Sequence, residues 1–167
     1  MKECPRGSYC PDGAQIPTPC PRGTYGPLTM STSLFGCPVC PAGSLCNTTG
    51  VVDPTDFLCP PGYYCGRGST DPIKCPSGSY RAVPGGSSSS SCFICDAGYF
   101  CPQEATIVPS ICPNGTYCPA ASNQSTPCPP GYYCPANSAS PILCPRGFYC
   151  PGRSELMYKC ANGTYCP

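Results

Sequence analysis

Apolar positions along the chain follow a short repeat, in which two cysteines and an aromatic residue alternate with Pro, Gly and polar residues. The unit is Cys-Pro-x-Gly-x-Tyr-Cys-Pro, as at residues 144–151. Its first cysteine falls at ten positions: Cys4, Cys20, Cys40, Cys59, Cys75, Cys95, Cys112, Cys128, Cys144 and Cys160. Glycine follows by three residues in every copy, and an aromatic residue follows by five in all copies but that of Leu45. A fixed period of this kind indicates tandem units rather than one folded core.

Each unit predicts a tight turn followed by a short extended segment. In Cys-Pro-x-Gly, Pro has the fixed φ of the second position of a β-turn and Gly takes the fourth position, which is the pattern of a type I turn. The following x-Tyr-Cys is then extended, and a small hairpin per unit is expected. The chain contains 26 Pro and 19 Gly, which nearly excludes helices.

A second, longer period lies above the first. Two units, 20–39 and 75–94, are longer than the regular 16 residues and replace their second cysteine with Gly26 and Arg81. Each regains a cysteine further on, at Cys37 and Cys92. Six cysteines recur after a shift of 55 residues: Cys4, Cys10, Cys20, Cys37, Cys40 and Cys46 become Cys59, Cys65, Cys75, Cys92, Cys95 and Cys101. The sequence thus predicts a three-unit block at 1–58, its second copy at 59–111, and regular 16-residue units at 112–167.

Composition explains how such a chain can fold without a large core. Leu, Ile, Val and Phe together number 22 of 167 residues, whereas cysteine alone numbers 20 of 167. That balance is typical of a disulfide scaffold, and paired cysteines indicate an oxidising, extracellular or cell-surface compartment. We therefore expect a small disulfide-rich fold: an elongated tandem-repeat rod of short β and irregular units with almost no helix.

Spacing leaves two disulfide connectivities open. In the first, each unit closes on itself and all twenty cysteines are used: Cys4–Cys10, Cys20–Cys37, Cys40–Cys46, Cys59–Cys65, Cys75–Cys92, Cys95–Cys101, Cys112–Cys118, Cys128–Cys134, Cys144–Cys150 and Cys160–Cys166. In the second, each unit is linked to the next, as in Cys10–Cys20. The second scheme forces Cys37–Cys40 and Cys92–Cys95 into tight four-residue loops, so the first is favoured, although sequence alone does not fix the pairing.

Residues 20–25 and 37–43, Cys-Pro-Arg-Gly-Thr-Tyr and Cys-Pro-Val-Cys-Pro-Ala-Gly, resemble the ephrin-receptor-like cysteine-rich repeat. That repeat is related in style to EGF-like and tumour-necrosis-factor-receptor-like modules. The resemblance extends over the whole chain and implies an extracellular array, often within a very large surface protein, but no particular ligand. The chain departs from the usual pattern in its many short units, where Cys-Pro follows Tyr directly.

Glycosylation is the most specific chemical signal. Four asparagines satisfy the Asn-x-Ser/Thr acceptor pattern: Asn47, Asn114, Asn123 and Asn162. Asn114 and Asn162 both occupy the third position of the predicted turn, which is an exposed position. A chance match in a Thr- and Ser-rich chain is the alternative, but for an extracellular chain we expect N-linked glycans.

Other site chemistry is poorly supported. Cys37/Cys40 and Cys92/Cys95 have zinc-ligand spacing, but the chain has no His and its other sixteen cysteines form no such pairs. The eight acidic residues are scattered and there is no imidazole base, so we expect no catalytic, metal or cofactor site and no enzyme activity. A net charge of +1 without a basic patch argues against nucleic acid as partner.

The expected function is structural: an extracellular repeat segment that builds a glycosylated filament, stalk or wall by self-association. The alternative is a ligand-binding or adhesion segment of a surface receptor's ectodomain. The regular tyrosines are expected to pack on disulfides, and the neighbouring rings are candidates for contacts between chains: Tyr63, Tyr99, Tyr132 and Phe148. No apolar run suits a signal peptide or membrane span, and the chain starts and stops within the repeat, so we expect part of a longer protein.

Overall fold

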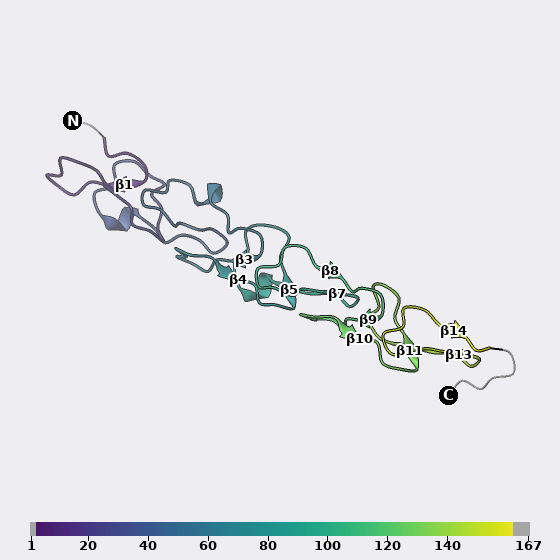
Figure 1. The fold of residues 1–167 in the computed structure, drawn as a ribbon. Coiled ribbons are helices and arrows are strands. Elements are labelled where there is room, and N and C mark those ends of the chain that lie inside the picture. Colours follow the sequence, from purple (N-terminus) through teal and green to yellow (C-terminus); the bar gives the residue numbers. More distant parts are fainter. Residues whose placement is uncertain (1–2, 162–167) are drawn as a thin grey trace. The chain divides into compact units, whose positions relative to one another are not determined.

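A computed structural model describes residues 3–161 and divides into two compact units. Unit 1 comprises Met1–Cys75 and Arg81–Cys92, and unit 2 comprises Pro76–Tyr80 and Phe93–Pro167. Within each unit, short two-stranded antiparallel hairpins follow one another in chain order (Figure 1). Residues 3–161 contain no α-helix. The structure confirms a disulfide-rich fold of repeated short hairpins with almost no helix.

Every strand has two residues, and every sheet is one hairpin. Unit 1 holds β1 (Ser8–Tyr9) with β2 (Thr18–Pro19) and β3 (Tyr63–Tyr64) with β4 (Ile73–Lys74). Unit 2 holds β5 (Ser79–Tyr80) with β6 (Phe93–Ile94), β7 (Tyr99–Phe100) with β8 (Ser110–Ile111), β9 (Thr116–Tyr117) with β10 (Thr126–Pro127), β11 (Tyr132–Tyr133) with β12 (Ile142–Leu143), and β13 (Phe148–Tyr149) with β14 (Tyr158–Lys159). Single bridges, Thr24 to Val39 and Ser44 to Leu58, replace the hairpin in two further repeats of unit 1.

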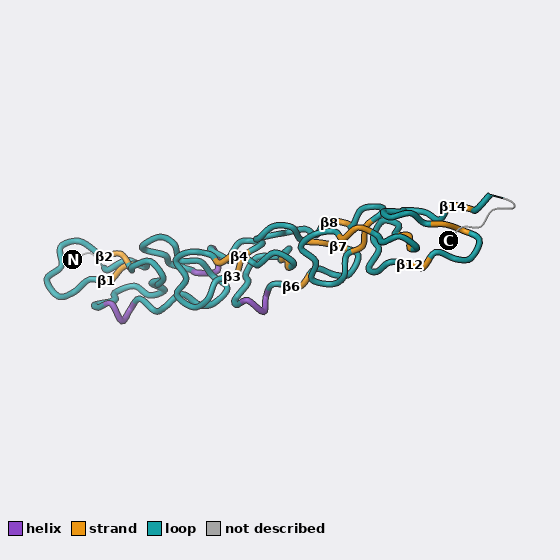
Figure 2. The backbone as a smooth tube through the Cα atoms, turned by 60° about the horizontal axis from the view of Figure 1, so that its bottom comes forward, coloured by secondary structure: helices purple, strands orange, loops and turns teal. Residues whose placement is uncertain are grey.

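Three single-turn 3-10 helices lie in unit 1, drawn in purple in Figure 2: η1 (Leu34–Gly36), η2 (Pro54–Asp56) and η3 (Ser89–Ser91). η1 and η3 lie in the two long disulfide loops, at positions that differ by 55 residues. The serine run that contains η3 is therefore structured. The side chains of Ser88 and Ser91 form a reciprocal capping box around η3.

The β-turn of each repeat begins one residue later than the sequence predicts. The N–H of the residue after glycine donates to the carbonyl of the residue after cysteine, as in Thr24 to Pro21 at 3.1 Å and Thr116 to Pro113 at 3.1 Å. Glycine is thus the third residue of the turn, and its positive φ, +81° at Gly23, is what a type II turn requires. The predicted type I turn is wrong because its closing groups, the glycine N–H and the cysteine C=O, bond to neighbouring repeats instead.

Successive repeats are joined by the same four backbone hydrogen bonds. Between repeats 112–127 and 128–143 the bonds run from the N–H of Gly115 to Cys134 O (2.8 Å), Cys128 to Gly115 O (2.9 Å), Cys118 to Ser138 O (2.9 Å) and Asn137 to Cys112 O (2.8 Å). The set recurs at four successive junctions in unit 1 and three in unit 2. It satisfies backbone groups that two-residue strands would otherwise leave without partners.

The interior of each unit consists of disulfides rather than aliphatic side chains. Apart from Pro54 and several glycines, sixteen apolar residues are buried in the described part of the chain; fifteen are cysteines and the other is Val51. Tyr25 packs against the cluster formed by Cys40, Cys46 and Val51, so this ring covers the disulfide of the next repeat. Bridges therefore occupy the place of a conventional hydrophobic core.

Candidate functional site

Nine disulfides are formed among the described residues, each within one repeat. They are Cys4–Cys10, Cys20–Cys37, Cys40–Cys46, Cys59–Cys65, Cys75–Cys92, Cys95–Cys101, Cys112–Cys118, Cys128–Cys134 and Cys144–Cys150. These are pairs of the first connectivity. Cys160 is also disulfide-bonded, and its predicted partner Cys166 lies outside the described residues. Both CxxC segments are therefore divided between separate bridges and do not act as chelating pairs.

Three of the four glycosylation sequons lie within the described residues, and all three asparagines are exposed. Asn114 is in the first turn of its repeat, inside the ring closed by Cys112–Cys118. Asn47 and Asn123 follow Cys46 and Cys118 and lie outside the rings. Asn162 lies outside the described residues. Glycans on these four residues stay a prediction.

An exposed aliphatic position recurs at the residue just before the first cysteine of each repeat, which we term the pre-cysteine position. All ten members lie in the described part of the chain and are exposed: Glu3, Pro19, Val39, Leu58, Lys74, Ile94, Ile111, Pro127, Leu143 and Lys159. Five of them are aliphatic, with exposed fractions from 45 % at Val39 to 67 % at Leu143. An aliphatic residue before the first cysteine recurs visibly in the sequence, but the regular aromatic series did not predict its exposure.

The aromatic rings do not separate into a buried and an exposed set. Of the candidate contact rings, Tyr63, Tyr99 and Phe148 are half-buried, and Tyr132 is exposed. Tyr149 belongs to the regular series and is also exposed. Two regular tyrosines lie next to a cross-strand ring: Tyr80 to Phe93 at 6.2 Å and Tyr149 to Tyr158 at 5.5 Å between ring centroids.

The long loop at residues 26–37 carries an apolar tip. Leu28, Met30, Leu34 and Phe35 are all exposed, and Phe35 is 99 % exposed. No acidic or basic residue occurs between Gly26 and Cys37. Single exposed apolar residues are ordinary on protein surfaces, but several on one uncharged loop mark a candidate contact.

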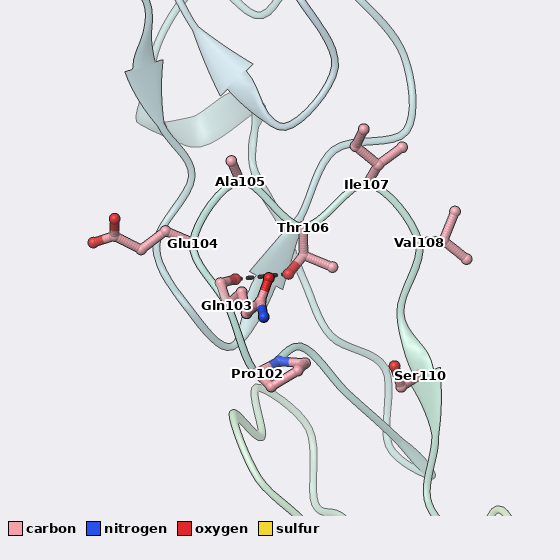
Figure 3. A pocket seen from close by; sticks show the side chains of 8 residues that line it. All are labelled: Pro102, Gln103, Glu104, Ala105, Thr106, Ile107, Val108 and Ser110. Carbon is pink, nitrogen blue, oxygen red and sulfur yellow. Dashed lines mark hydrogen bonds between the residues drawn. The ribbon is translucent and has the colours of Figure 1, made fainter.

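The loop at residues 102–110 in unit 2 borders a shallow open hollow of about 400 Å³ (Figure 3). Glu104 points to one side and Ile107 and Val108 point to the other, so polar groups do not converge there (Figure 3). The hydroxyl of Thr106 donates to the Gln103 carbonyl at 2.6 Å and holds the turn. The hollow thus lacks the convergent polar groups of a ligand site.

One acidic residue, Asp53, stabilises local structure. Asp53 caps η2 by accepting hydrogen bonds from the Thr55 hydroxyl at 2.7 Å and the Thr55 N–H at 2.9 Å. These two bonds lower the pKa of the Asp53 carboxyl below its usual value of 3.8, and the bond from the Thr55 hydroxyl has the larger effect. Residues 3–161 hold no group of three or more His, Cys, Asp or Glu placed to bind a metal. Nor does any helix in this part of the chain have the length and apolarity to cross a membrane.

No family model matches the chain. It is 31 % identical over 114 residues, 63 % of its length, to the ABC transporter G family member 25 of Oryza sativa subsp. japonica. It is 31 % identical over 122 residues, 71 % of its length, to the ABC transporter G family member 28 of Arabidopsis thaliana. The chain spans a tenth or less of the length of these relatives, 10 % and 8 %.

A second group of relatives consists of extracellular multidomain proteins. The chain is 34 % identical over 83 residues, 47 % of its length, to the human signal peptide, CUB and EGF-like domain-containing protein 3, of which the match covers 8 %. It is also 36 % identical over 84 residues to the signal peptide, CUB and EGF-like domain-containing protein 2 of Danio rerio. The chain is therefore a set of disulfide-rich repeats similar to segments of secreted or surface proteins, and its disulfides and these relatives indicate an extracellular or cell-surface location.

Proposed function

We propose that the chain is a structural segment of a larger extracellular protein, a glycosylated stalk, filament or wall element. The observation that carries this proposal is the junction: one set of four backbone hydrogen bonds recurs at four junctions in unit 1 and three in unit 2. Each repeat thereby binds its neighbours through the main chain, whatever its side chains are. Such nearest-neighbour contacts allow an array to be lengthened by adding units.

Self-association between chains is part of this proposal. The pre-cysteine position supports it, because Ile94, Ile111 and Leu143 of unit 2 are exposed by 61 %, 58 % and 67 %. Each lies on a two-residue strand, and its cross-strand partner is a tyrosine or a serine: Tyr99 for Ile111, Tyr132 for Leu143 and Ser79 for Ile94. Lateral packing of copies would bury these aliphatic side chains and stabilise an assembly.

Electron microscopy of the protein isolated from its natural source, without reduction, tests the structural role. Regular filaments or sheets with density for sugars on their outer faces are the expected result. Dispersed single molecules that bind one defined soluble ligand would contradict it. Variants with Ser at Ile111 and Leu143 test the packing surface, and we expect them to weaken assembly without loss of the folded repeats.

An adhesion or ligand-binding segment of a surface receptor is the second candidate. The apolar tip at residues 26–37 favours it, since Phe35 is fully exposed on a loop without charge. Under this alternative, the unmodified protein forms no filaments and binds a partner protein. The Phe35→Ser variant then loses that binding. Under the structural proposal, the same variant leaves assembly through the pre-cysteine position intact.

A further inference from the structure

Two of the described sequons lie on loops, and the third lies inside a hydrogen-bonded ring. In the sequon 114–116, Asn114 is in the turn and Thr116 is in β9, which pairs with β10. The hydrogen bonds of the sequon include Ala136 N–H to Asn114 Oδ1 (2.7 Å), Gly115 N–H to Cys134 O (2.8 Å), Thr116 N–H to Pro113 O (3.1 Å), Thr116 Oγ1 to Pro113 O (2.6 Å) and Cys128 N–H to Gly115 O (2.9 Å). The Thr116 hydroxyl also lies 3.3 Å from Cys112 Sγ. The Cys112–Cys118 disulfide closes a ring that contains residues 114–116.

The sequons at Asn47 and Asn123 have none of these restraints. Among residues 3–161, their side chains, and those of Thr49 and Ser125, form no hydrogen bonds, and the backbone groups of residues 47–49 and 123–125 take part in none of the junction bonds. Each sequon follows the second cysteine of its repeat, so closing the ring does not enclose it. The acceptor asparagine stays accessible whether or not the disulfide has formed.

A glycosyltransferase must hold the asparagine and the hydroxyl residue of its sequon together in its own site. At Asn47 and Asn123 the folded chain can supply both groups. At Asn114 the transferase would have to break the bonds of the Asn114 carboxamide and the Thr116 hydroxyl and remove β9 from its hairpin. We propose that closure of the Cys112–Cys118 ring competes with glycosylation of Asn114, so that the disulfide controls the occupancy of this sequon.

The chemistry of the transfer is compatible with the folded state that follows it. The donor is an oligosaccharide on a polyprenyl diphosphate: the bond between its anomeric carbon and the diphosphate oxygen breaks, and a bond to Asn114 Nδ2 forms. The diphosphate leaves with the electron pair, and one amide hydrogen leaves as a proton. The Oδ1 atom is unchanged and can still accept from Ala136, so a glycan added before ring closure does not prevent the junction from forming.

This inference rests on the extracellular location in the proposed function. Its test is the occupancy of each asparagine, measured by mass spectrometry after enzymatic deglycosylation in heavy-oxygen water, in the full-length protein made in a eukaryotic secretory pathway. We expect Asn47 and Asn123 to be occupied and Asn114 to be under-occupied. The double variant C112S/C118S should raise Asn114 to the level of Asn123.

The matched control is C4S/C10S, which opens a ring of equal size that contains no sequon. We expect it to leave Asn114 unchanged, which excludes general misfolding as the cause of any rise. A pulse of reductant during synthesis of the unmodified chain delays ring closure without any substitution and should also raise Asn114. Equal occupancy of Asn114 and Asn123 in the unmodified protein, or no response of Asn114 to ring opening, overturns the inference. If no sequon carries a glycan, the result also contradicts the glycosylation that is part of the proposed function.

Discussion

The two long loops of unit 1, residues 26–37 and 81–92, have the same backbone conformation but different side chains inside them. Each is closed by a disulfide with a sequence separation of 17, and each contains a 3-10 turn at the corresponding position. A residue with positive φ recurs as well, at Met30 and, 55 residues later, at Gly85. The same chain path is thus built twice.

The interiors of the loops differ at the position where a regular repeat has its second cysteine. Gly26 has no room for a side chain, because a Cβ there would lie 2.8 Å from the backbone of Gly7 and 3.0 Å from the sulfur of Cys20. Arg81, its counterpart, is buried, with 8 % of its surface exposed. Its guanidinium donates to the carbonyls of Ser91 at 2.7 Å and Pro84 at 3.1 Å.

This difference shows which features determine the loop backbone. The junction bonds are the same on both sides: Gly7 N–H donates to Gly26 O, and Gly62 N–H donates to Arg81 O. Main-chain bonds and the disulfide therefore fix the path, and side chains within the loop add stability on top. The first loop has its disulfide and its main-chain bonds, whereas the second also has an internal brace from Arg81.

The largest expected effect comes from removing the two disulfides. Loop-closure entropy predicts that C20S/C37S and C75S/C92S each cost about 3 kcal/mol, since both bridges close loops of equal length. The loops should nonetheless respond differently, because Arg81 still bonds to Ser91 after its loop is opened. Denaturant unfolding measures the cost, and hydrogen exchange of the loop amides measures the difference. Equal loss of protection in both opened loops would show that Arg81 is not a brace.

Removal of the brace itself is the next largest effect. Arg81→Ala should cost about 2–3 kcal/mol. Its two hydrogen bonds from a charged group contribute roughly 1.5–3 kcal/mol each, but the buried Nε, which has no partner among the described residues, offsets part of that gain. Arg67→Ala is the matched control, since Arg67 is an exposed arginine in the preceding repeat and should change stability by about 0.5 kcal/mol or less. Similar costs for the two variants would contradict the brace.

These features differ in how far the sequence could predict them. Spacing favoured the intra-repeat pairing without fixing it, because each long repeat lacks a cysteine at Gly26 or Arg81 and has one further on, at Cys37 or Cys92. The burial of Arg81 did not follow, since an arginine beside a serine-rich loop ordinarily lies in water. Only the folded path brings the carbonyls of Pro84 and Ser91 within reach of its guanidinium.

The register of the turn was also beyond the sequence. Cys-Pro-x-Gly fits a type I turn when one repeat is considered alone. In the array, the N–H of Gly23 bonds to Cys46 O and the carbonyl of Cys20 accepts from Gly50, so neither group is free to close that turn. Hydrogen bonds to the next repeat therefore override the local turn preference of Cys-Pro-x-Gly, and the sequence of a single repeat does not reveal those bonds.

A smaller effect tests the shared backbone at one residue. Met30 has a φ of +57° and Gly85 a φ of +80°, and left-handed backbone costs a non-glycine residue about 1–2 kcal/mol. Gly85→Ala should therefore destabilise by about 1 kcal/mol, although a Cβ there would find its nearest neighbour, on Leu58, only at 4.0 Å. Met30→Gly should stabilise by up to about 1 kcal/mol, since relief of strain exceeds the added freedom of the unfolded chain. Denaturant midpoints that shift in the same direction would show that the two loops do not share this conformation.

The smallest effect on stability is expected at the loop tips, where the loops differ most in chemistry. Phe35 is 99 % exposed, and its counterpart 55 residues later is Ser90, which is also exposed. Phe35→Ser makes the first tip resemble the second, and the free energy of unfolding should change by no more than about 0.5 kcal/mol, because the ring loses no packing. Ser90→Phe is the reciprocal control and should be equally neutral. A cost well above this limit for Phe35→Ser would show that the ring packs within the folded protein, and the tip would then be part of the fold rather than a surface for a partner.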